Sequence, residues 1–367
     1  MKNICFLCRV IFAISLLSVF STQFYAQQDK VINSSFQPLI DDKSHVGIVV
    51  GVIDKNGQKI YSFGSSANAN QKLDGDSVFE IGSITKVFTS ILLADMAEQR
   101  EINLTDPINL YLPSTIKVPQ YEEKEITFLD LATHTSGLPE FPANVKPKDE
   151  SNPLAEYTVA QLYSSLSSLK LKRNIGAEYE YSSMGMGLLG HVLSLKAGAS
   201  YEDLIVNRIC KPLDLPNTRI KLSPAMQARL IKGFDENGKP TANWDLPTLA
   251  GAGALRSSAN DMLKFIAENL EPNKTPLAAA MLNAQLPRHR AKSQKNTMYV
   301  GLGWHILNFK GNEIIWHDGG TGGYTSVICF DKKHGIGLVA LSNSAENDDK
   351  SVLPKLGLQT LIKIISN

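Results

Sequence analysis

The sequence predicts an α/β fold in which a single antiparallel sheet takes its strands from both ends of the chain. Runs typical of β-strands lie near the start and again after residue 297, whereas short helical patterns separated by Pro and Gly fill 105–296. The strand-like runs follow one another through turns, without the regular strand–helix alternation of a parallel sheet. We therefore expect one domain with an α/β part at about 40–104 and 297–367, flanked by helices, and an inserted, mainly helical region at about 105–296.

The first strands form a predicted hairpin. Val, Ile and Gly alternate and cluster over 45–54, and alternation returns over 58–63. Asn56-Gly57 between them supplies the positive φ angles that a tight turn needs. After the hairpin, apolar residues at helical spacing predict a long, largely buried helix over 83–99.

The middle and the end of the chain supply the remaining elements. Helices are expected at 127–132, 158–169, 184–196 and 258–269, the last opening on a sequence that resembles a capping box at Ser258. Apolar, β-rich runs separated by turns predict strands at 300–308, 313–317, 324–331 and 335–343. An amphipathic pattern over 352–365 predicts a closing helix.

Residues 1–26 have the pattern of a secretory signal peptide. Lys2 and Arg9 give a basic start, an apolar run follows over 10–20, and Ala26 offers a small residue for cleavage. The run is short for a bilayer span, and the alternative is an N-terminal membrane anchor. We expect a secreted protein, with 27–367 as a single domain and no stable membrane span after cleavage.

Charge and cysteine content narrow the possible partners. The formal net charge of +1 becomes −1 when the first 26 residues are removed, and no basic cluster remains. This balance argues against nucleic acid or an anionic membrane as a partner. Cys5 and Cys8 lie in the signal segment; Cys210 and Cys329 could pair after export, but two unpaired core thiols are favoured.

Ser83 and Lys86 are the strongest chemical signal. Residues i and i+3 share a face of a helix, so the hydroxyl of Ser83 and the amine of Lys86 can meet. A partly desolvated lysine can take the proton of a serine hydroxyl and make it a nucleophile. Orphan N–H groups at the start of a helix would favour a developing oxyanion.

Two further segments have the composition of an active-site wall. Tyr181-Ser182-Ser183 places hydroxyl groups just before a helix that is rich in small residues. His317-Asp318-Gly319 opens a stretch with four glycines at a strand edge, where the backbone can approach a ligand closely.

In this order, Ser83-x-x-Lys86, Tyr181-Ser182-Ser183 and His317-Asp318-Gly319 resemble the three signature elements of penicillin-recognising serine hydrolases. The chain is most similar to the class C β-lactamase superfamily, which includes D-alanyl-D-alanine carboxypeptidase/endopeptidases and related esterases. The resemblance extends over nearly the whole mature chain and includes 131–138 and 301–304.

The resemblance implies a role for each matching residue. Ser83 would be the nucleophile that forms an acyl-enzyme, Lys86 would hold the proton network that activates it, and Tyr181 would carry protons to the leaving nitrogen and from the hydrolytic water. The backbone N–H groups of Ser83 and Gly320 would form the oxyanion hole. Substrate binding would fall to the remaining motif positions, Ser183, His317, Asp318 and Gly319; neither a metal nor a cofactor is implied.

Two departures from the family pattern bear on the substrate. Ser183 stands where β-lactamases usually carry Asn, and His317-Asp318-Gly319 stands where they carry Lys-Thr-Gly. A histidine with an ordinary pKa of about 6.5 is largely neutral at pH 7, and Asp318 adds negative charge beside it. Both changes fit the peptidase and esterase branches better than a fast β-lactamase.

The resemblance therefore implies a periplasmic enzyme, with 27–367 as its catalytic domain, that hydrolyses β-lactams, D-alanyl-D-alanine-type peptides, or both, through a Ser83 acyl-enzyme. We expect it to act as a monomer on these small-molecule or peptide substrates. One alternative is an esterase or D-amino-acid amidase of the same fold, and a second is a non-catalytic protein that binds muropeptides.

Single residues also have structural alternatives. Tyr181 could be a core tyrosine, and His317 could be a plain strand residue. For His134 and Arg256 a structural role is the favoured interpretation. Trp304 and Trp316 are expected to be packing residues on strands.

Overall fold

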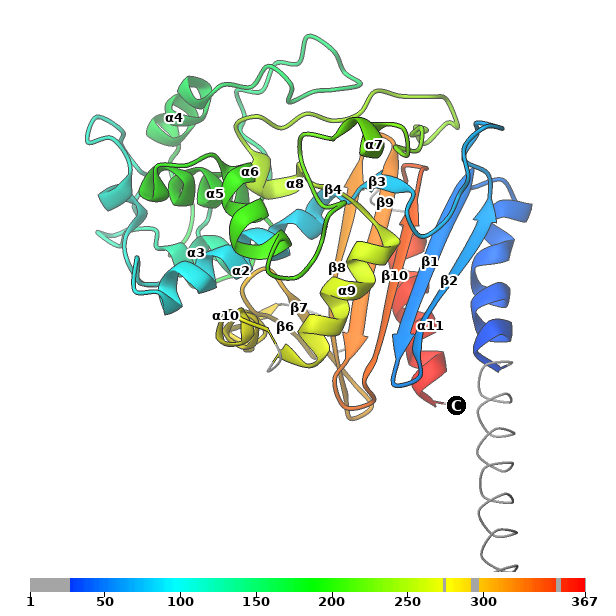
Figure 1. The fold of residues 1–367 in the computed structure, drawn as a ribbon. Helices are drawn as coiled ribbons and strands as arrows, with labels where there is room; N and C mark the ends of the chain where they lie inside the picture. The colour runs from blue at the N-terminus through cyan, green and yellow to red at the C-terminus, as the bar shows by residue number, and fades with distance from the viewer. Residues whose placement is uncertain (1–26, 273–274, 292–296, 348–350, 367) are drawn as a thin grey trace, which may run out of the picture.

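A computed structural model describes residues 27–272, 275–291, 297–347 and 351–366, so the predicted signal peptide at 1–26 lies outside the described residues. Its centre is an eight-stranded antiparallel sheet in the order β2-β1-β10-β9-β8-β7-β6-β5 (Figure 1). The sheet thus takes strands from both ends of the chain, as predicted, and the first strand pairs with the last, with Val50 opposite Ala340. The strands are β1 (Gly47–Asp54), β2 (Gly57–Gly64), β5 (His289–Ala291), β6 (Thr297–Val300), β7 (His305–Phe309), β8 (Asn312–Thr321), β9 (Tyr324–Asp331) and β10 (Ile336–Ser342).

Helices cover both faces of this sheet. On one face, α2 (Thr85–Glu98) and α9 (Ala259–Leu270) belong to the larger apolar core. On the other, the helix at 27–41 and α11 (Leu353–Ser366) enclose a second core. Because both faces are covered, every residue of β9 and β10 is buried, although antiparallel strands often leave one face in water.

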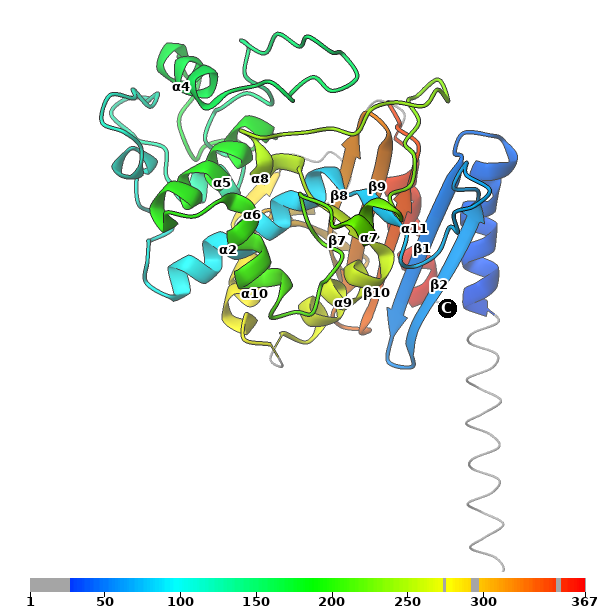
Figure 2. The same ribbon diagram turned by 45° about the horizontal axis from the view of Figure 1, so that its top comes forward.

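The helical region lies beside the sheet, away from β1 and β2 (Figure 1), and the turned view of Figure 2 shows the same arrangement. Thr127 and Thr158 form complete capping boxes at the first two of its helices, and Ser182 caps the third. The helices of this region are α3 (Phe128–Ala132), α4 (Val159–Ser168), α5 (Ser183–Ala197), α6 (Tyr201–Ile205), α7 (Pro224–Gln227), α8 (Ala250–Gly253) and α10 (Ala278–Ala284). The predicted helices therefore all form, with bounds that differ by a residue or two.

The predicted strand at 300–308 is wrong in one respect, because it is two strands, β6 and β7, joined by a short loop. Gly303 in this loop has a φ of 69° and donates its N–H to the Ala132 carbonyl at 2.9 Å. A Cβ on Gly301 would lie 2.3 Å from the Ala284 carbonyl oxygen. The loop therefore packs backbone against backbone, which an uninterrupted strand could not do.

α6, α7, α8 and α10 lie in the region predicted to hold short helices but were not individually expected, and four further helices or strands of the described chain were not expected at all. These are the helix at 27–41, the short strand β5, and the two-stranded pair β3 (Val78–Glu80) and β4 (Arg256–Ser258). α9 also departs from the expected division, because it packs directly on the sheet. A Cβ on Gly337 of β10 would lie 2.2 Å from a methyl group of Ile266.

The two cysteines of the described chain are free and buried, as the sequence favoured. Burial raises the pKa of the Cys210 thiol to about 12, so it stays protonated at neutral pH. Within the described ranges, no helix combines the length and the apolar character needed to cross a membrane.

The contact between α11 and β9 gives a prediction about stability. A Cβ on Gly357 would lie 2.6 Å from Cγ1 of Val327, a stiff β-branched side chain. Although alanine favours a helix over glycine by about 1 kcal/mol, we expect Gly357→Ala to lower the free energy of unfolding by about 1–3 kcal/mol through overpacking. Denaturant unfolding measures this change.

Val327→Ala provides the matched background for that test. With the valine methyl groups removed, Gly357→Ala is expected to stabilise the helix. An increase in stability in the wild-type background would show that the close contact does not control this interface.

Candidate active site

The turn that carries Ser83 touches the backbone of β8. It is a short 3-10 helix, η1 (Gly82–Ile84), in which Gly82 has a φ of 49°. A Cβ on Gly82 would lie 2.7 Å from the carbonyl oxygen of Gly320, and a Cβ on Gly319 would lie 2.7 Å from the backbone nitrogen of Ser83. Glycine at these positions lets the turn and the strand approach each other at backbone distance.

Lys86 lies on the first turn of α2, directly below Ser83. Its Nζ is 2.7 Å from Ser83 Oγ and 2.7 Å from the carbonyl oxygen of Ala252, and its side chain is fully buried. Burial lowers the pKa of Lys86 to about 7, although the carboxylates of Asp318 and Glu140 act in the opposite direction. A substantial fraction of the amine is therefore neutral near pH 7 and can accept the proton of Ser83.

Tyr181 completes this group from the segment before α5. Its ring centroid is 4.8 Å from Lys86 Nζ, and the hydroxyl of Ser83 is one of the groups that act on the Tyr181 phenol. Burial nevertheless raises the pKa of Tyr181 well above its ordinary value. Tyr181 is thus a neutral phenol that can give and receive a proton, and the base that titrates near neutrality is Lys86.

A cleft of ≈ 510 Å³ opens over Ser83. It lies at the end of β8 beyond Trp316, the last residue of that strand that pairs with β7. Among the predicted site residues, the cleft is lined by Ser83, Tyr181, Ser183, Asp318, Gly319 and Gly320. Residues that the sequence did not single out line the rest: Glu140, Phe141, Trp244, His305, Thr321, Glu346 and Asn347.

The prediction that His317 binds substrate is not supported by its position. The side chain is completely buried, it is not among the residues that line the cleft, and its Nδ1–H donates to the Asp318 carbonyl at 2.6 Å. Burial, and the proximity of His305 and Lys86, lower its pKa well below the ordinary value. His317 is therefore a neutral residue behind the wall of the cleft.

Trp244 is held at the cleft by a buried ion pair. Glu80 accepts the Trp244 N–H at 2.9 Å, and Arg256 donates to the Trp244 carbonyl at 2.8 Å. Glu80 and Arg256 are cross-strand partners in the β3–β4 pair, with 3.2 Å between Oε1 and Nη2. The structural interpretation of Arg256 thus agrees with its contacts, and only the tertiary pairing of two short strands reveals its link to the cleft.

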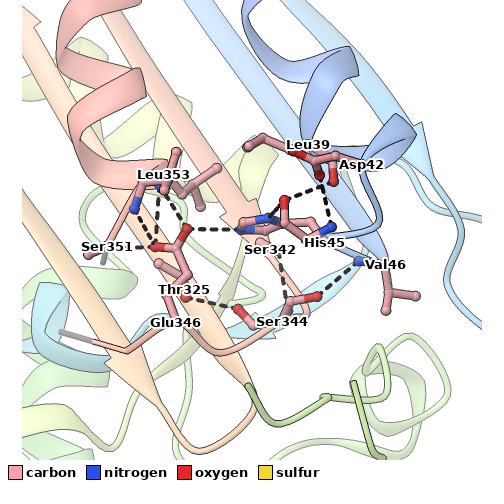
Figure 3. A network of polar contacts seen from close by, with 12 residues as sticks. Leu39, Asp42, His45, Val46, Thr325, Ser342, Ser344, Glu346, Ser351 and Leu353 are labelled. Atoms are coloured by element: carbon pink, nitrogen blue, oxygen red, sulfur yellow. Dashed lines mark hydrogen bonds and ion pairs between the residues drawn. The ribbon is translucent and has the colours of Figure 1, made fainter. Parts of the chain in front are cut away.

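Glu346 is fixed on the other side of the cleft. Figure 3 shows its carboxylate between His45, whose Nε2 is 3.3 Å away, and the backbone N–H of Leu353, which donates at 3.0 Å. Although burial raises it, these partners lower the pKa of Glu346 below its ordinary value. An ionised Glu346 therefore joins the cleft wall to the first turn of α11.

The described residues that line the cleft include no lysine or arginine. His305 adds no positive charge, because burial and the nearby Lys86 lower its pKa to about 4. Lys86 itself lies beneath Ser83, so the wall of the cleft carries carboxylates and neutral groups.

Comparison with known proteins gives a consistent picture. Residues 32–361 match the family model described as Beta-lactamase. The D-alanyl-D-alanine-carboxypeptidase/endopeptidase AmpH of Escherichia coli K12 is 28% identical over 92% of this chain and 90% of its own length. A β-lactamase of Pseudomonas fluorescens is 24% identical over 86% of this chain and 93% of its own length.

A solved structure shares the fold. The β-lactamase/D-alanine carboxypeptidase of Yersinia pestis superposes with a TM-score of 0.79 at 24% identity, over 93% of this chain and 99% of that one. The family match spans most of the sequence and includes the Ser83, Tyr181 and β8 segments that meet at the cleft. The chain belongs to the beta-lactamase family and is a serine hydrolase of the β-lactamase/DD-peptidase type.

Proposed function

We propose that this protein is an exported, periplasmic hydrolase of the class C type that forms an acyl-enzyme at Ser83 with β-lactams, D-alanyl-D-alanine-type peptides, or both. The observation that carries the proposal is the desolvated Lys86 amine, 2.7 Å from Ser83 Oγ at the floor of the cleft. The three catalytic side chains and the cleft come from one chain, which fits a monomer.

Acylation begins when neutral Lys86 takes the proton of Ser83 as Oγ attacks the substrate carbonyl carbon. The carbonyl oxygen becomes an oxyanion, which the backbone N–H groups of Ser83 and Gly320 stabilise; such donors contribute about 3 kcal/mol each in comparable sites. The proton then passes through the Tyr181 hydroxyl to the leaving nitrogen, and the carbon–nitrogen bond breaks. Ser83 now carries the acyl group as an ester.

Deacylation uses the same groups in reverse. A water molecule gives its proton to the Tyr181–Lys86 pair and attacks the ester carbonyl. The bond to Ser83 Oγ breaks, and the serine oxygen takes the proton back. The carboxylic acid product leaves, and Lys86 is again neutral.

A second candidate is hydrolysis of small esters or D-amino-acid amides that lack a carboxylate. The cleft favours it because Asp318 and Glu140 contribute negative charge and none of the described lining residues is a lysine or arginine. An anionic group on the substrate would meet repulsion there at neutral pH. The acyl-transfer chemistry at Ser83 is the same in both cases.

Incubation of residues 27–367 with a penicillin tests the proposal. We expect the intact mass to increase by one penicillin on Ser83, because Lys86 activates that hydroxyl. Mass spectrometry over time, with Ser83→Ala as the control, detects the adduct, while the penicillin in solution is assayed in parallel.

The outcomes separate the candidates. A persistent adduct with intact penicillin in solution indicates a penicillin-binding peptidase, and a fleeting adduct with consumption of the drug indicates a β-lactamase. Ser83-dependent turnover of esters without any penicillin adduct supports the second candidate. Equal activity of wild type and Ser83→Ala on every acyl substrate would contradict both.

The pH dependence of kcat/KM tests the role of Lys86. Only the neutral amine accepts a proton, and its pKa is about 7, so we expect activity to rise with pH through about 7. Lys86→Arg keeps a permanent cation and is expected to lower kcat/KM by about 10²-fold or more at every pH. Initial rates from pH 5 to 9, on a substrate without titratable groups, measure both effects.

Lys332 is the control, since partial desolvation also lowers its pKa although the residue is exposed and does not line the cleft. Lys332→Met is expected to leave the rise of kcat/KM with pH unchanged. If kcat/KM of the wild type does not rise between pH 5 and 9, Lys86 is excluded as the base.

A further inference from the structure

Five aromatic side chains form a closed ring at the cleft, and two of them, Tyr181 and His305, line it. Neighbouring centroids around this five-ring cluster are 4.7 Å apart for His134–Tyr181, 6.4 Å for Tyr181–His317, 5.0 Å for His317–His305, 6.2 Å for His305–Tyr179 and 5.8 Å for Tyr179–His134. Tyr181 is the one member with a place in the proposed proton transfers. The contacts of the other four with Tyr181 therefore bear on how its hydroxyl is held.

His134 contacts the Tyr181 segment through both its ring and its backbone. Its ring stacks on that of Tyr181 with an interplanar angle of 29°. Its carbonyl oxygen accepts the Glu180 N–H at 2.8 Å, and its Nδ1 accepts the Ser182 N–H at 3.1 Å. One residue thus fixes the side chain of Tyr181 and the backbone on both sides of it.

The backbone of His134 is in an unusual conformation. Its φ is 58°, in the left-handed region that few side chains adopt, and the residue is 2% exposed. Such a conformation persists where surrounding contacts impose it and is often found at functional sites. At His134 this conformation belongs to the C-terminal cap of α3, in which the His134 N–H donates to the Leu131 carbonyl at 3.3 Å and the Thr135 N–H donates to the Asp130 carbonyl at 2.9 Å. From this cap, His134 makes its contacts with 180–182.

The geometry also requires His134 to be uncharged. Nδ1 accepts an N–H, so it carries no proton, and the ring proton is on Nε2. A protonated ring would turn Nδ1 into a donor facing another donor and would place a buried cation near Lys86. His134 is therefore suited to hold Tyr181 and not to exchange protons with substrate.

We propose that His134 is a positioning residue for Tyr181, which it holds with the phenol ring over Lys86 Nζ and the hydroxyl near Ser83. This inference rests on the proposed function, because it requires Tyr181 to transfer a proton during acyl transfer. Because Tyr181 acts in the transition state, loss of the contacts between His134 and 180–182 is expected to lower kcat more than it raises KM.

Two substitutions separate the contacts of His134. His134→Asn places an acceptor near the position of Nδ1 and tolerates a positive φ, but it removes the stacked ring. His134→Phe keeps a ring and removes the acceptor. We expect each to lower kcat by about 10- to 100-fold, as small misplacements of catalytic groups do, with KM changed less than about threefold.

The decisive measurement is a double-mutant cycle with Tyr181→Phe. Because His134 acts through the Tyr181 hydroxyl, His134→Asn is expected to cost less than about threefold in the Tyr181→Phe background. The fraction of Ser83 labelled by a fluorophosphonate, corrected for reaction time, shows whether each variant remains folded around its nucleophile.

His191 provides the matched control. It also contacts a tyrosine, with its Nε2 2.7 Å from the Tyr163 hydroxyl, and it does not line the cleft. His191→Asn is expected to leave kcat unchanged.

Failure of this proposal can be told from failure of the proposed function. Activity that survives Ser83→Ala overturns the acyl-enzyme itself. Two results would overturn the positioning role of His134 alone, provided that activity still requires Ser83 and Tyr181. In the first, His134→Asn lowers activity equally in both Tyr181 backgrounds; in the second, it does not lower activity at all.

Discussion

The approach of the Ser83 turn to β8 is the constraint on which the rest of the site depends. Side chains at Gly82 or Gly319 would collide with backbone across this contact, because the available distances are shorter than any Cβ tolerates. The contact brings the start of α2 to the end of β8, and Ser326 of β9 reinforces it by donating its hydroxyl to the Ile81 carbonyl at 2.9 Å. The sheet is thus both the core of the fold and the rigid wall against which the nucleophile is placed.

The electrostatics of the site follow from what surrounds Lys86. Burial removes water from the amine, and the three histidines nearest to it (His134, His305 and His317) have lowered pKa values and stay neutral. Each of these imidazoles would cost additional free energy if it took up a proton beside Lys86. Near neutral pH, Lys86 is therefore the group of this site that changes its protonation state, and the aromatic side chains around it determine the shape of the site.

Much of the fold could be predicted from the sequence because its signals are local. The predicted turn joins β1 to β2, although Gly57 has a positive φ and Asn56 does not. Thr127 and Thr158 cap their helices, and apolar spacing identifies the buried α2. The spacing of Ser83 and Lys86 likewise predicts the contact between them, because a helical turn fixes it. These inferences needed no knowledge of how distant segments pack.

The remaining features depend on tertiary contacts that no local pattern encodes. His317 looks like a cleft residue in sequence, but the pleat of β8 and the packing of His305 place it behind the wall. Trp244 lies in a segment without periodicity and reaches the cleft because Glu80 and Arg256, far apart in sequence, grip its backbone. For the same reason, the contacts between His134 and 180–182 can be identified only in the folded structure.

The sheet order has a consequence for the sequence of events during synthesis. Ser83 and Lys86 emerge from the ribosome early, but β8, which carries the facing wall, and β10, which joins β1 to the sheet, are near the end of the chain. Pairings between such distant segments form slowly, because the intervening chain must first lose the entropy of a long loop. A nascent or truncated chain that stops before β8 therefore carries a serine and a lysine without the wall that makes them a hydrolase. The topology delays reactivity until the protein is complete.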